Sequence, residues 1–206
     1  SNQHRWFQES RKSKDNPYHD WYIWRDPAPA GGKPNNWASI FGGDAWEFDE
    51  SRGQYYYHMF HKHQPDLNWR NPEVLSTMLD VFRYWLDKGV DGFRLDVFNN
   101  YYQDALFRDN PKTQSFSVRK LLRKFDAFDH LYDTNQPEMI EVVEDIRKIM
   151  DSYPDRYVVG ETFLVDSASA RTYIGPNRLH AGFDYAFCNA PFSAKAYGKE
   201  IQYWDA

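Results

Sequence analysis

The stretch that decides the fold is Gly-Val-Asp-Gly-Phe-Arg-Leu-Asp-Val, residues 89–97. Its apolar residues favour strands, and their alternation with the other residues predicts a β-strand over 90–97. Gly92, Arg94 and Asp96 would then share one face of that strand. An arginine and a carboxylate on an inward face are unusual for packing alone, because buried charges are costly unless they are paired.

We therefore expect Arg94 and Asp96 to be close neighbours. A guanidinium beside the carboxylate would keep Asp96 ionised and fix its orientation. An oriented, ionised carboxylate at the C-terminal end of a strand suits a nucleophile. On the pattern alone, a structural ion pair that ties the strand to its neighbours is an equally good interpretation.

A helix is predicted directly before this strand, over residues 72–88. Asn71 is an acceptable N-cap, Pro72 suits the first helical position, and Gly89 can adopt the left-handed conformation that ends a helix. The predicted apolar stripe of the helix is Val74, Met78, Val81, Phe82, Trp85 and Leu86. A helix, a tight glycine turn and a buried strand form the repeating unit of a parallel α/β fold.

The same unit recurs further along the chain. A second helix is predicted over 137–152, and a second buried strand over 156–161 ends in Glu161. The predicted buried side of this helix is Met139, Val142, Val143, Ile146, Ile149 and Met150. Each predicted strand therefore carries a carboxylate at its C-terminal end, where parallel strands of a barrel collect their catalytic groups.

The remaining elements are less regular. Residues 1–69 hold six of the eight tryptophans, interrupted by proline and glycine, and predict an irregular subdomain with a short strand near 55–60. Further along, a third strand is predicted over 183–187 and a last helix over 192–203.

Composition excludes several classes of function. The 41% of hydrophobic residues support a sizeable core, and the net charge of −5 leaves no basic face for nucleic acid. No apolar run approaches the roughly 20 residues that span a bilayer. Cys188 is the single cysteine, which fits a reducing compartment. We therefore expect a cytoplasmic protein with neither nucleic acid nor membrane as a partner.

Two carboxylates at the ends of neighbouring parallel strands suggest a reaction. Strands lie about 4.8 Å apart, so Asp96 and Glu161 could approach the roughly 5–5.5 Å that retaining glycosidases require. Asp96 could attack an anomeric carbon, while Glu161, away from a cation and partly desolvated, could protonate the leaving oxygen. The alternative for Glu161 is a helix N-cap. Together the two positions indicate glycoside hydrolysis by double displacement.

Three motifs resemble the α-amylase superfamily of glycoside hydrolases, family 13. They are Gly-Phe-Arg-Leu-Asp-Val at 92–97, Gly-Glu at 160–161 and Gln-Pro-Asp-Leu-Asn-Trp at 64–69. Their order is similar to that of the oligo-1,6-glucosidase and α-glucosidase branch. The resemblance implies an α/β fold in which 70–206 form a partial (β/α)8 TIM barrel, about strands 4 to 6 and helices 3 to 6. It also implies that residues 1–69 form part of an inserted domain B.

The resemblance implies catalytic roles as well. Asp96 matches the nucleophile that forms a covalent glucosyl intermediate, Arg94 the residue that positions it, and Glu161 the general acid and base. Val97 follows the nucleophile, and valine there goes with α-1,6 linkages in this branch. We therefore expect a retaining, exo-acting α-glucosidase that releases terminal glucose from short α-linked oligosaccharides, α-1,6 favoured.

The same resemblance points to a wall of the glucose pocket. Phe60 and Gln64 match residues that line the site of the terminal glucose, and Phe41 resembles another part of that wall. For each of the three, packing alone is the alternative.

Two parts of the family's site have no match in this sequence. These are the Asp-x-x-x-x-His segment at the end of strand 3 and the His-Asp pair at the end of strand 7, for which Asp184 and Asp205 lack the local pattern. A complete barrel takes about 250 residues, so the chain resembles an internal segment. Expressed alone, it is expected to be unstable and inactive, because strand edges and apolar helix faces would be exposed.

No cofactor follows from this chemistry, since two carboxylates suffice. A metal site is not expected either: on a strand, one of three nearby histidines faces away from the other two (His58, against His61 and His63). One alternative function is a transglycosylating or isomerising relative, of the sucrose isomerase or trehalose synthase type. Another is a non-catalytic glucosidase-like transporter subunit. The sequence predicts no oligomeric state.

Overall fold

The computed structural model describes residues 1–114 and 122–205. The chain divides into two compact units. The first consists of Ser1–Met78 and Asn100–Gln136, and the second of Leu79–Asn99 and Pro137–Ala206. The assignment of residues 1–69 to a domain B-like part and 70–206 to a barrel part stays a prediction.

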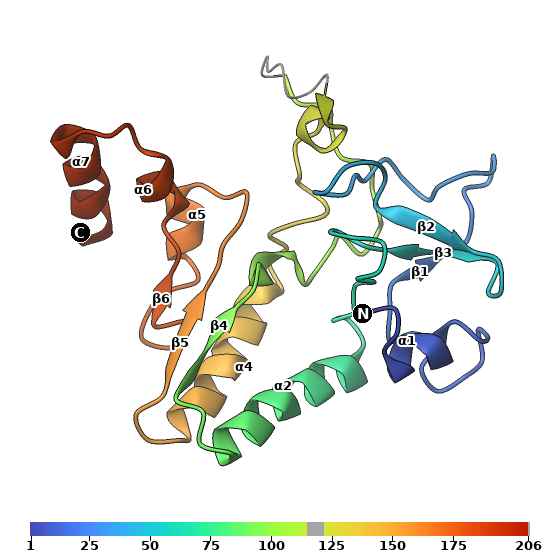
Figure 1. Cartoon of the computed structure of the whole chain (residues 1–206), viewed down its shortest axis with the longest axis horizontal. Coiled ribbons are helices and arrows are strands. Elements are labelled where there is room, and N and C mark those ends of the chain that lie inside the picture. Colours follow the sequence, from blue (N-terminus) through green and yellow to red (C-terminus); the bar gives the residue numbers. More distant parts are fainter. Residues whose placement is uncertain (115–121, 206) are drawn as a thin grey trace. The chain divides into compact units, whose positions relative to one another are not determined.

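The first unit contains a small antiparallel sheet. The strands of this sheet are β1 (Trp24–Arg25), β2 (Trp46–Asp49) and β3 (Gln54–Tyr57) (Figure 1). The same unit also contains helix α1 (Arg5–Ser10) and the 3-10 helix η2 (Phe125–Ala127). The strands lie in the order β1-β3-β2, with Trp46 of β2 opposite Tyr57 of β3. The strand predicted over 55–60 is therefore present, but it ends at Tyr57.

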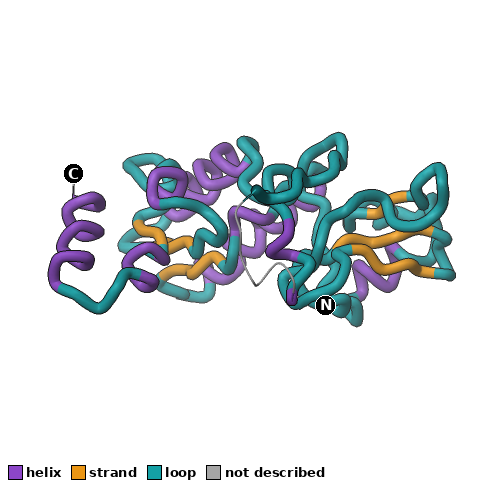
Figure 2. Tube along the Cα trace, turned by 90° about the horizontal axis from the view of Figure 1, so that it is seen from above, coloured by secondary structure: helices purple, strands orange, loops and turns teal. Residues whose placement is uncertain are grey.

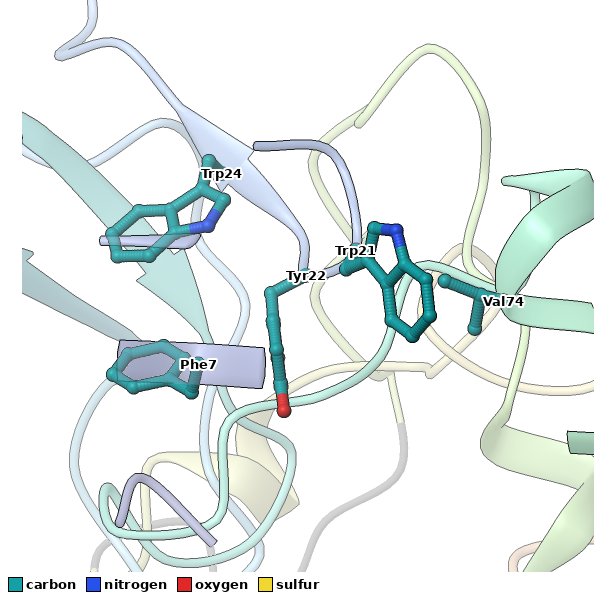
Figure 3. Packing of buried hydrophobic residues seen from close by; sticks show 5 residues of the cluster. All are labelled: Phe7, Trp21, Tyr22, Trp24 and Val74. Atoms are coloured by element: carbon teal, nitrogen blue, oxygen red, sulfur yellow. The ribbon is translucent and has the colours of Figure 1, made fainter. Parts of the chain in front are cut away.

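Aromatic side chains form a core of the first unit. Phe7 stacks on Trp24 with 5.5 Å between ring centroids and meets Tyr22 edge-on at 5.0 Å. Trp21 and Val74 belong to the same buried cluster (Figure 3). Aromatic rings bury a large area each and dominate the energetics of a core. Much of the aromatic content of the N-terminal third therefore serves packing.

The second unit contains a short parallel sheet. Its strands β4 (Gly92–Leu95), β5 (Tyr157–Gly160) and β6 (Ala181–Gly182) lie in the order β4-β5-β6 and are orange in Figure 2. Leu95 lies opposite Gly160, so β4 and β5 end at the same level. The helices of this unit are η1 (Phe98–Asn100), which reaches its boundary, α4 (Met139–Asp151), α5 (Ser167–Arg171), α6 (Tyr185–Asn189) and α7 (Ala194–Asp205).

Helix α2 (Pro72–Asp87) crosses the boundary between the units and confirms the prediction over 72–88. The N–H of Glu73 donates to the side chain of Asn71 at 2.9 Å, and Gly89 has a φ of 88°. The predicted stripe is only partly correct. Val74, Phe82 and Leu86 are buried, whereas Val81 and Trp85 are 37% and 46% exposed.

Helix α4 confirms its prediction more fully, because all six residues of its predicted buried side are buried. The helix lies beside β5 in the second unit (Figure 1). Helix α4 followed by parallel β5 is the predicted helix–strand unit of a parallel α/β fold.

The strands predicted over 90–97 and 183–187 also differ from the structure. The strand predicted over 90–97 ends at Leu95, because Val97 has a φ of 41°, which no strand accommodates. The strand predicted over 183–187 is wrong: the Asp184 side chain accepts the N–H of Phe187 at 2.9 Å and caps helix α6. The aspartate cap starts a helix in place of the predicted strand.

Across the two described ranges, none of the helices has the length and apolar character needed to cross a bilayer.

Candidate active site

One guanidinium contacts both predicted catalytic carboxylates. Arg94 Nη1 lies 2.8 Å from Asp96 Oδ1, and Arg94 Nη2 donates to Glu161 Oε2. The expected pairing of Arg94 with Asp96 is confirmed. The expectation that Glu161 stands away from a cation was wrong. In the β4–β5 register Arg94 lies opposite Val159, two residues before Glu161, and its side chain reaches that carboxylate.

The strand pairing positions the two carboxylates. Glu161 donates its backbone N–H to the carbonyl of Leu95 at 2.9 Å, one step beyond the last strand pair. Asp96 follows Leu95 directly, so each carboxylate comes immediately after the C-terminal end of its strand. This is the edge of a parallel sheet where catalytic groups gather.

The three charged side chains differ in exposure. Those of Arg94 and Asp96 are 47% and 73% exposed, so the expectation of a buried pair was wrong, whereas that of Glu161 is 12% exposed. The Arg94 guanidinium also lies 5.6 Å from the ring centroid of Phe183. Glu161 is therefore the sheltered carboxylate and Asp96 the accessible one.

Tyr185 is a contact of Glu161 that the sequence did not predict. Its O–H donates to Glu161 Oε1. Burial raises the pKa of Tyr185 to about 12, and the hydrogen bond to Glu161 adds to this shift.

The N-cap interpretation of Glu161 was wrong, because Asp166 caps the next helix, α5, by accepting the N–H of Ser169 at 2.7 Å.

Asn99 joins the segments that follow the two strands. Its side-chain amide donates to the carbonyl of Phe163 at 2.6 Å and accepts the N–H of the same residue at 3.0 Å. Asn99 is fully buried. It lies three residues after Asp96, and Phe163 lies two residues after Glu161, so this amide fixes the segments that follow the two carboxylates to each other. Its position close behind the predicted nucleophile, Asp96, is the sequence signal that could have identified it.

Val97 occupies an unusual backbone conformation. Its φ of 41° is rare for a β-branched residue and costs free energy. The turn directs the chain from Asp96 to Phe98, which is fully buried and meets Tyr173 edge-on at 4.9 Å. Strained residues of this kind cluster at functional sites.

The predicted pocket-wall residues lie in the first unit. Phe41 and Phe60 meet edge-on at 5.8 Å and line a hollow of about 270 Å³ together with Ser39 and His58. Phe41 is 67% exposed. Gln64 is exposed, and its backbone N–H donates to the carbonyl of His61 at 2.7 Å. That Phe41, Phe60 and Gln64 form one site together with Asp96 and Glu161 stays a prediction.

The three histidines do not form a metal group. His58 is buried, its Nδ1 lies 3.2 Å from the carbonyl oxygen of Phe60, and burial lowers its pKa. The rings of His61 and His63 lie 4.9 Å apart. Within residues 1–114 and 122–205, no three histidine, cysteine, aspartate or glutamate side chains group so that they could hold a metal ion.

The Gln-Pro-Asp-Leu-Asn-Trp motif has a structural function in the first unit. Asp66 accepts the backbone N–H of Met59 at 2.8 Å and donates its own N–H to the carbonyl of Tyr57 at 3.0 Å. Burial raises the pKa of Asp66 to about 7, although the Met59 hydrogen bond opposes the shift. The motif therefore fastens the segment after β3.

Comparisons with known proteins agree with these features. The chain matches the family "Alpha amylase, catalytic domain" over residues 1–204. It is 47% identical over 165 residues to a probable alpha-glucosidase of Rhizobium meliloti (strain 1021), covering 78% of this chain and 30% of that protein. It is 41% identical over 205 residues to an oligo-1,6-glucosidase of Parageobacillus thermoglucosidasius, covering 99% and 35%. The chain thus spans about a third of the length of these curated relatives.

Solved structures give the same result. The crystal structure of an alpha-glucosyl transfer enzyme matches with a TM-score of 0.91 and 40% identity, covering 100% of this chain and 39% of that chain. A trehalulose synthase mutant matches with a TM-score of 0.82 and 32% identity, covering 100% and 37%. These neighbours are TIM-barrel enzymes, so the parallel sheet and its helices are part of a (β/α)8 barrel, as predicted. Because the family match covers nearly every residue, the chain belongs to the α-amylase catalytic domain family, glycoside hydrolase family 13.

Proposed function

We propose that the complete protein is a retaining, exo-acting α-glucosidase that hydrolyses terminal α-linked glucose from short oligosaccharides, with α-1,6 linkages favoured. The observation that carries this proposal is the contact of Arg94 with both Asp96 and Glu161, beyond the ends of two adjacent parallel strands. The relatives named alpha-glucosidase and oligo-1,6-glucosidase support the same substrate class.

In the first proposed step, the carboxylate of Asp96 attacks the anomeric carbon. The bond from that carbon to the glycosidic oxygen breaks, and Glu161 gives its proton to this oxygen. The products are a glucosyl ester on Asp96, an ionised Glu161 and a free leaving sugar. Arg94, which contacts both side chains, holds the nucleophile and the acid in one arrangement throughout.

In the second proposed step, water attacks the same carbon. Glu161 takes a proton from the water while the ester bond to Asp96 breaks. Two inversions give glucose with retained configuration. Each residue returns to its starting protonation state, so no further reactant is needed.

We assign substrate contacts to four other residues. Phe41 and Phe60, whose rings line one hollow, and the exposed Gln64 would contact the terminal glucose. Val97, directly after the nucleophile, would shape the site of the second sugar. The apolar side chain of Val97 cannot donate a hydrogen bond to that sugar.

Carboxylate substitutions in the complete protein test the proposal. Glu161→Gln is expected to lower kcat/KM on isomaltose by about 10²–10⁴-fold, and Asp96→Asn by at least as much. The matched control is Asp91→Asn, which changes an exposed carboxylate paired with Arg156 just before the N-terminal end of β4. Wild-type turnover by either catalytic variant would contradict the proposed roles.

The configuration of the product tests the mechanism. Proton NMR during the first minutes of isomaltose hydrolysis is expected to show α-glucose first, with β-glucose arising only by mutarotation. Initial release of β-glucose would mean a single displacement and would exclude Asp96 as a covalent nucleophile.

Glucosyl transfer is the second candidate, and one observation favours it: the neighbour with a TM-score of 0.91 is an alpha-glucosyl transfer enzyme. The same two carboxylates would serve, with a sugar hydroxyl replacing water. Product analysis on sucrose, maltose and isomaltose distinguishes the two. Predominantly free glucose supports hydrolysis, whereas longer or isomerised sugars support transfer.

A further inference from the structure

The two oxygens of the Glu161 carboxylate have chemically different partners. Oε2 accepts from the Arg94 guanidinium, and Oε1 accepts from the hydroxyl of Tyr185. Tyr185 is the first residue of α6, and its helix begins there because Asp184 caps it. The side chain is half-buried, and its ring lies 6.4 Å from that of Phe183.

These partners respond differently when the carboxyl group takes up a proton. A guanidinium has only N–H donors, so it cannot accept a hydrogen bond from a protonated oxygen. A phenol can donate to an ionised oxygen and, after rotation of its O–H, accept from a protonated one. The pKa of Tyr185 near 12 keeps the phenol protonated over the working pH range. Oε1 is therefore the oxygen whose partner tolerates both protonation states.

We propose that Tyr185 is a positioning residue for Glu161, which selects Oε1 as the proton-carrying oxygen and holds the carboxyl group in both of its states. This proposal rests on the proposed function, because it assumes that Glu161 is the acid and base. In the first step, the Oε1 proton passes to the glycosidic oxygen and the phenol O–H turns to donate to the ionised Oε1. In the second step, Oε1 takes a proton from water and the phenol turns back.

Three other charged or titratable groups act on this carboxylate or on its contacts. Arg94 reaches it from β4, and Asp96 shares that guanidinium. Cys188, on α6 with Tyr185, acts electrostatically on the phenol. The contribution of Tyr185 can be separated from theirs, because Tyr185→Phe removes only its hydroxyl oxygen.

The test is Tyr185→Phe in the complete protein, which keeps the ring and removes the hydroxyl. Because a hydrogen bond from a donor favours the charged form of a carboxyl group, the alkaline limb of the pH profile of kcat/KM is expected to move up by about 0.5–1 pH unit. At neutral pH, kcat/KM on isomaltose is expected to fall about tenfold. On 4-nitrophenyl α-glucoside, whose leaving group needs little protonation, the loss is expected to stay below about threefold.

The matched control is Tyr153→Phe. Tyr153 also donates its hydroxyl to a carboxylate, that of Asp87 at 2.7 Å, so this variant loses the same kind of contact elsewhere in the second unit. It is expected to keep the wild-type profile on both substrates. An equal loss on both substrates in Tyr185→Phe, or a profile identical to that of Tyr153→Phe, would overturn the positioning role.

Glu161→Gln separates this proposal from the one on which it rests. If Glu161→Gln is inactive while Tyr185→Phe behaves as wild type, the function stands and the role of Tyr185 is wrong. If Glu161→Gln keeps wild-type turnover, both proposals are wrong. If Tyr185→Phe does not fold stably, the pH profile of kcat/KM is measured on Tyr185→Leu instead. Loss of the hydrogen-bond donor again predicts that the alkaline limb moves to higher pH, and an unchanged limb would refute the role of Tyr185.

Discussion

Replacing Gly92 by alanine tests the strand register that delivers both carboxylates. Gly92 lies opposite Tyr157 in the parallel β4–β5 pair. A Cβ at position 92 would lie 2.0 Å from the carbonyl oxygen and 3.0 Å from the carbonyl carbon of Tyr157. These are backbone atoms, which cannot rotate away as a side chain would, so the two strands must separate or slide.

The loss of stability in Gly92→Ala can be estimated from the backbone contacts that must change. Relieving one overpacked contact costs about 1–3 kcal/mol, and the loss of one hydrogen bond of the strand ladder adds about 1 kcal/mol. The nearest bond at risk runs from the N–H of Tyr157 to the carbonyl of Asp91 at 3.1 Å. We therefore expect Gly92→Ala to lower the free energy of unfolding by about 2–4 kcal/mol. The same displacement would move Arg94 relative to Glu161, so kcat/KM should fall as well.

Urea unfolding of the complete protein, followed by intrinsic fluorescence, measures the change. The control is Gly198→Ala in the interior of α7, where an added Cβ meets no atom within 4 Å and the backbone is helical. Helix propensity predicts that this variant is more stable by up to about 1 kcal/mol. If Gly92→Ala unfolded at the same urea concentration as the wild type, or later, the β4–β5 register described above would be wrong.

Three further changes have predicted outcomes. Asp66→Asn keeps an acceptor for the N–H of Met59 but removes the titratable carboxyl group. Between about pH 4 and pH 7 the folded protein, in which the pKa of Asp66 is near 7, keeps this carboxyl group protonated, whereas the unfolded chain, in which its pKa is near 3.8, does not. The wild-type free energy of unfolding should therefore decline from about pH 4 to pH 7, by at most about 1.4 kcal/mol per pH unit, and the decline should vanish in the variant; urea melts at several pH values check this. Asn99→Ala removes both hydrogen bonds to Phe163 and should lower kcat/KM more than tenfold with a loss of about 2–3 kcal/mol of stability, seen by parallel kinetics and unfolding. Val97→Thr should lower the isomaltose-to-maltose ratio of kcat/KM, and an unchanged ratio would exclude Val97 as the determinant of linkage preference.

The sequence predicted the long helices well because their signals are local. The apolar side of α4 follows from the 3.6-residue period, and all of its predicted members are buried. The start of α2 follows from the side-chain cap of Asn71. The width of the buried side of α2 was not predicted correctly, since Val81 and Trp85 are exposed. A period defines a stripe but not how wide a surface the neighbouring elements cover.

The contacts among the proposed catalytic residues were partly predictable for a related reason. Arg94 and Asp96 are two residues apart on one strand, so their contact needed no knowledge of register. The contact of Arg94 with Glu161 spans 67 residues and depends on how β4 pairs with β5. The contact of Tyr185 with Glu161 was not predicted, because a strand was predicted over 183–187 where an aspartate cap begins a helix.

The contacts of the two carboxylates also argue for which of them takes which role. Both lie in ion-pair contact with Arg94, so the cation alone does not distinguish them. Glu161 is the more sheltered, and it contacts a hydroxyl that can reverse its hydrogen bond, which suits a group that gains and loses a proton in each cycle. Asp96, 73% exposed at the strand end, is accessible to an incoming sugar. Exchanging the roles would place the nucleophile against the phenol of Tyr185 and the acid at the exposed strand end, away from that hydroxyl. Trapping with a 2-fluoro glucosyl inactivator should therefore label Asp96, and a label on Glu161 would reverse the assignment.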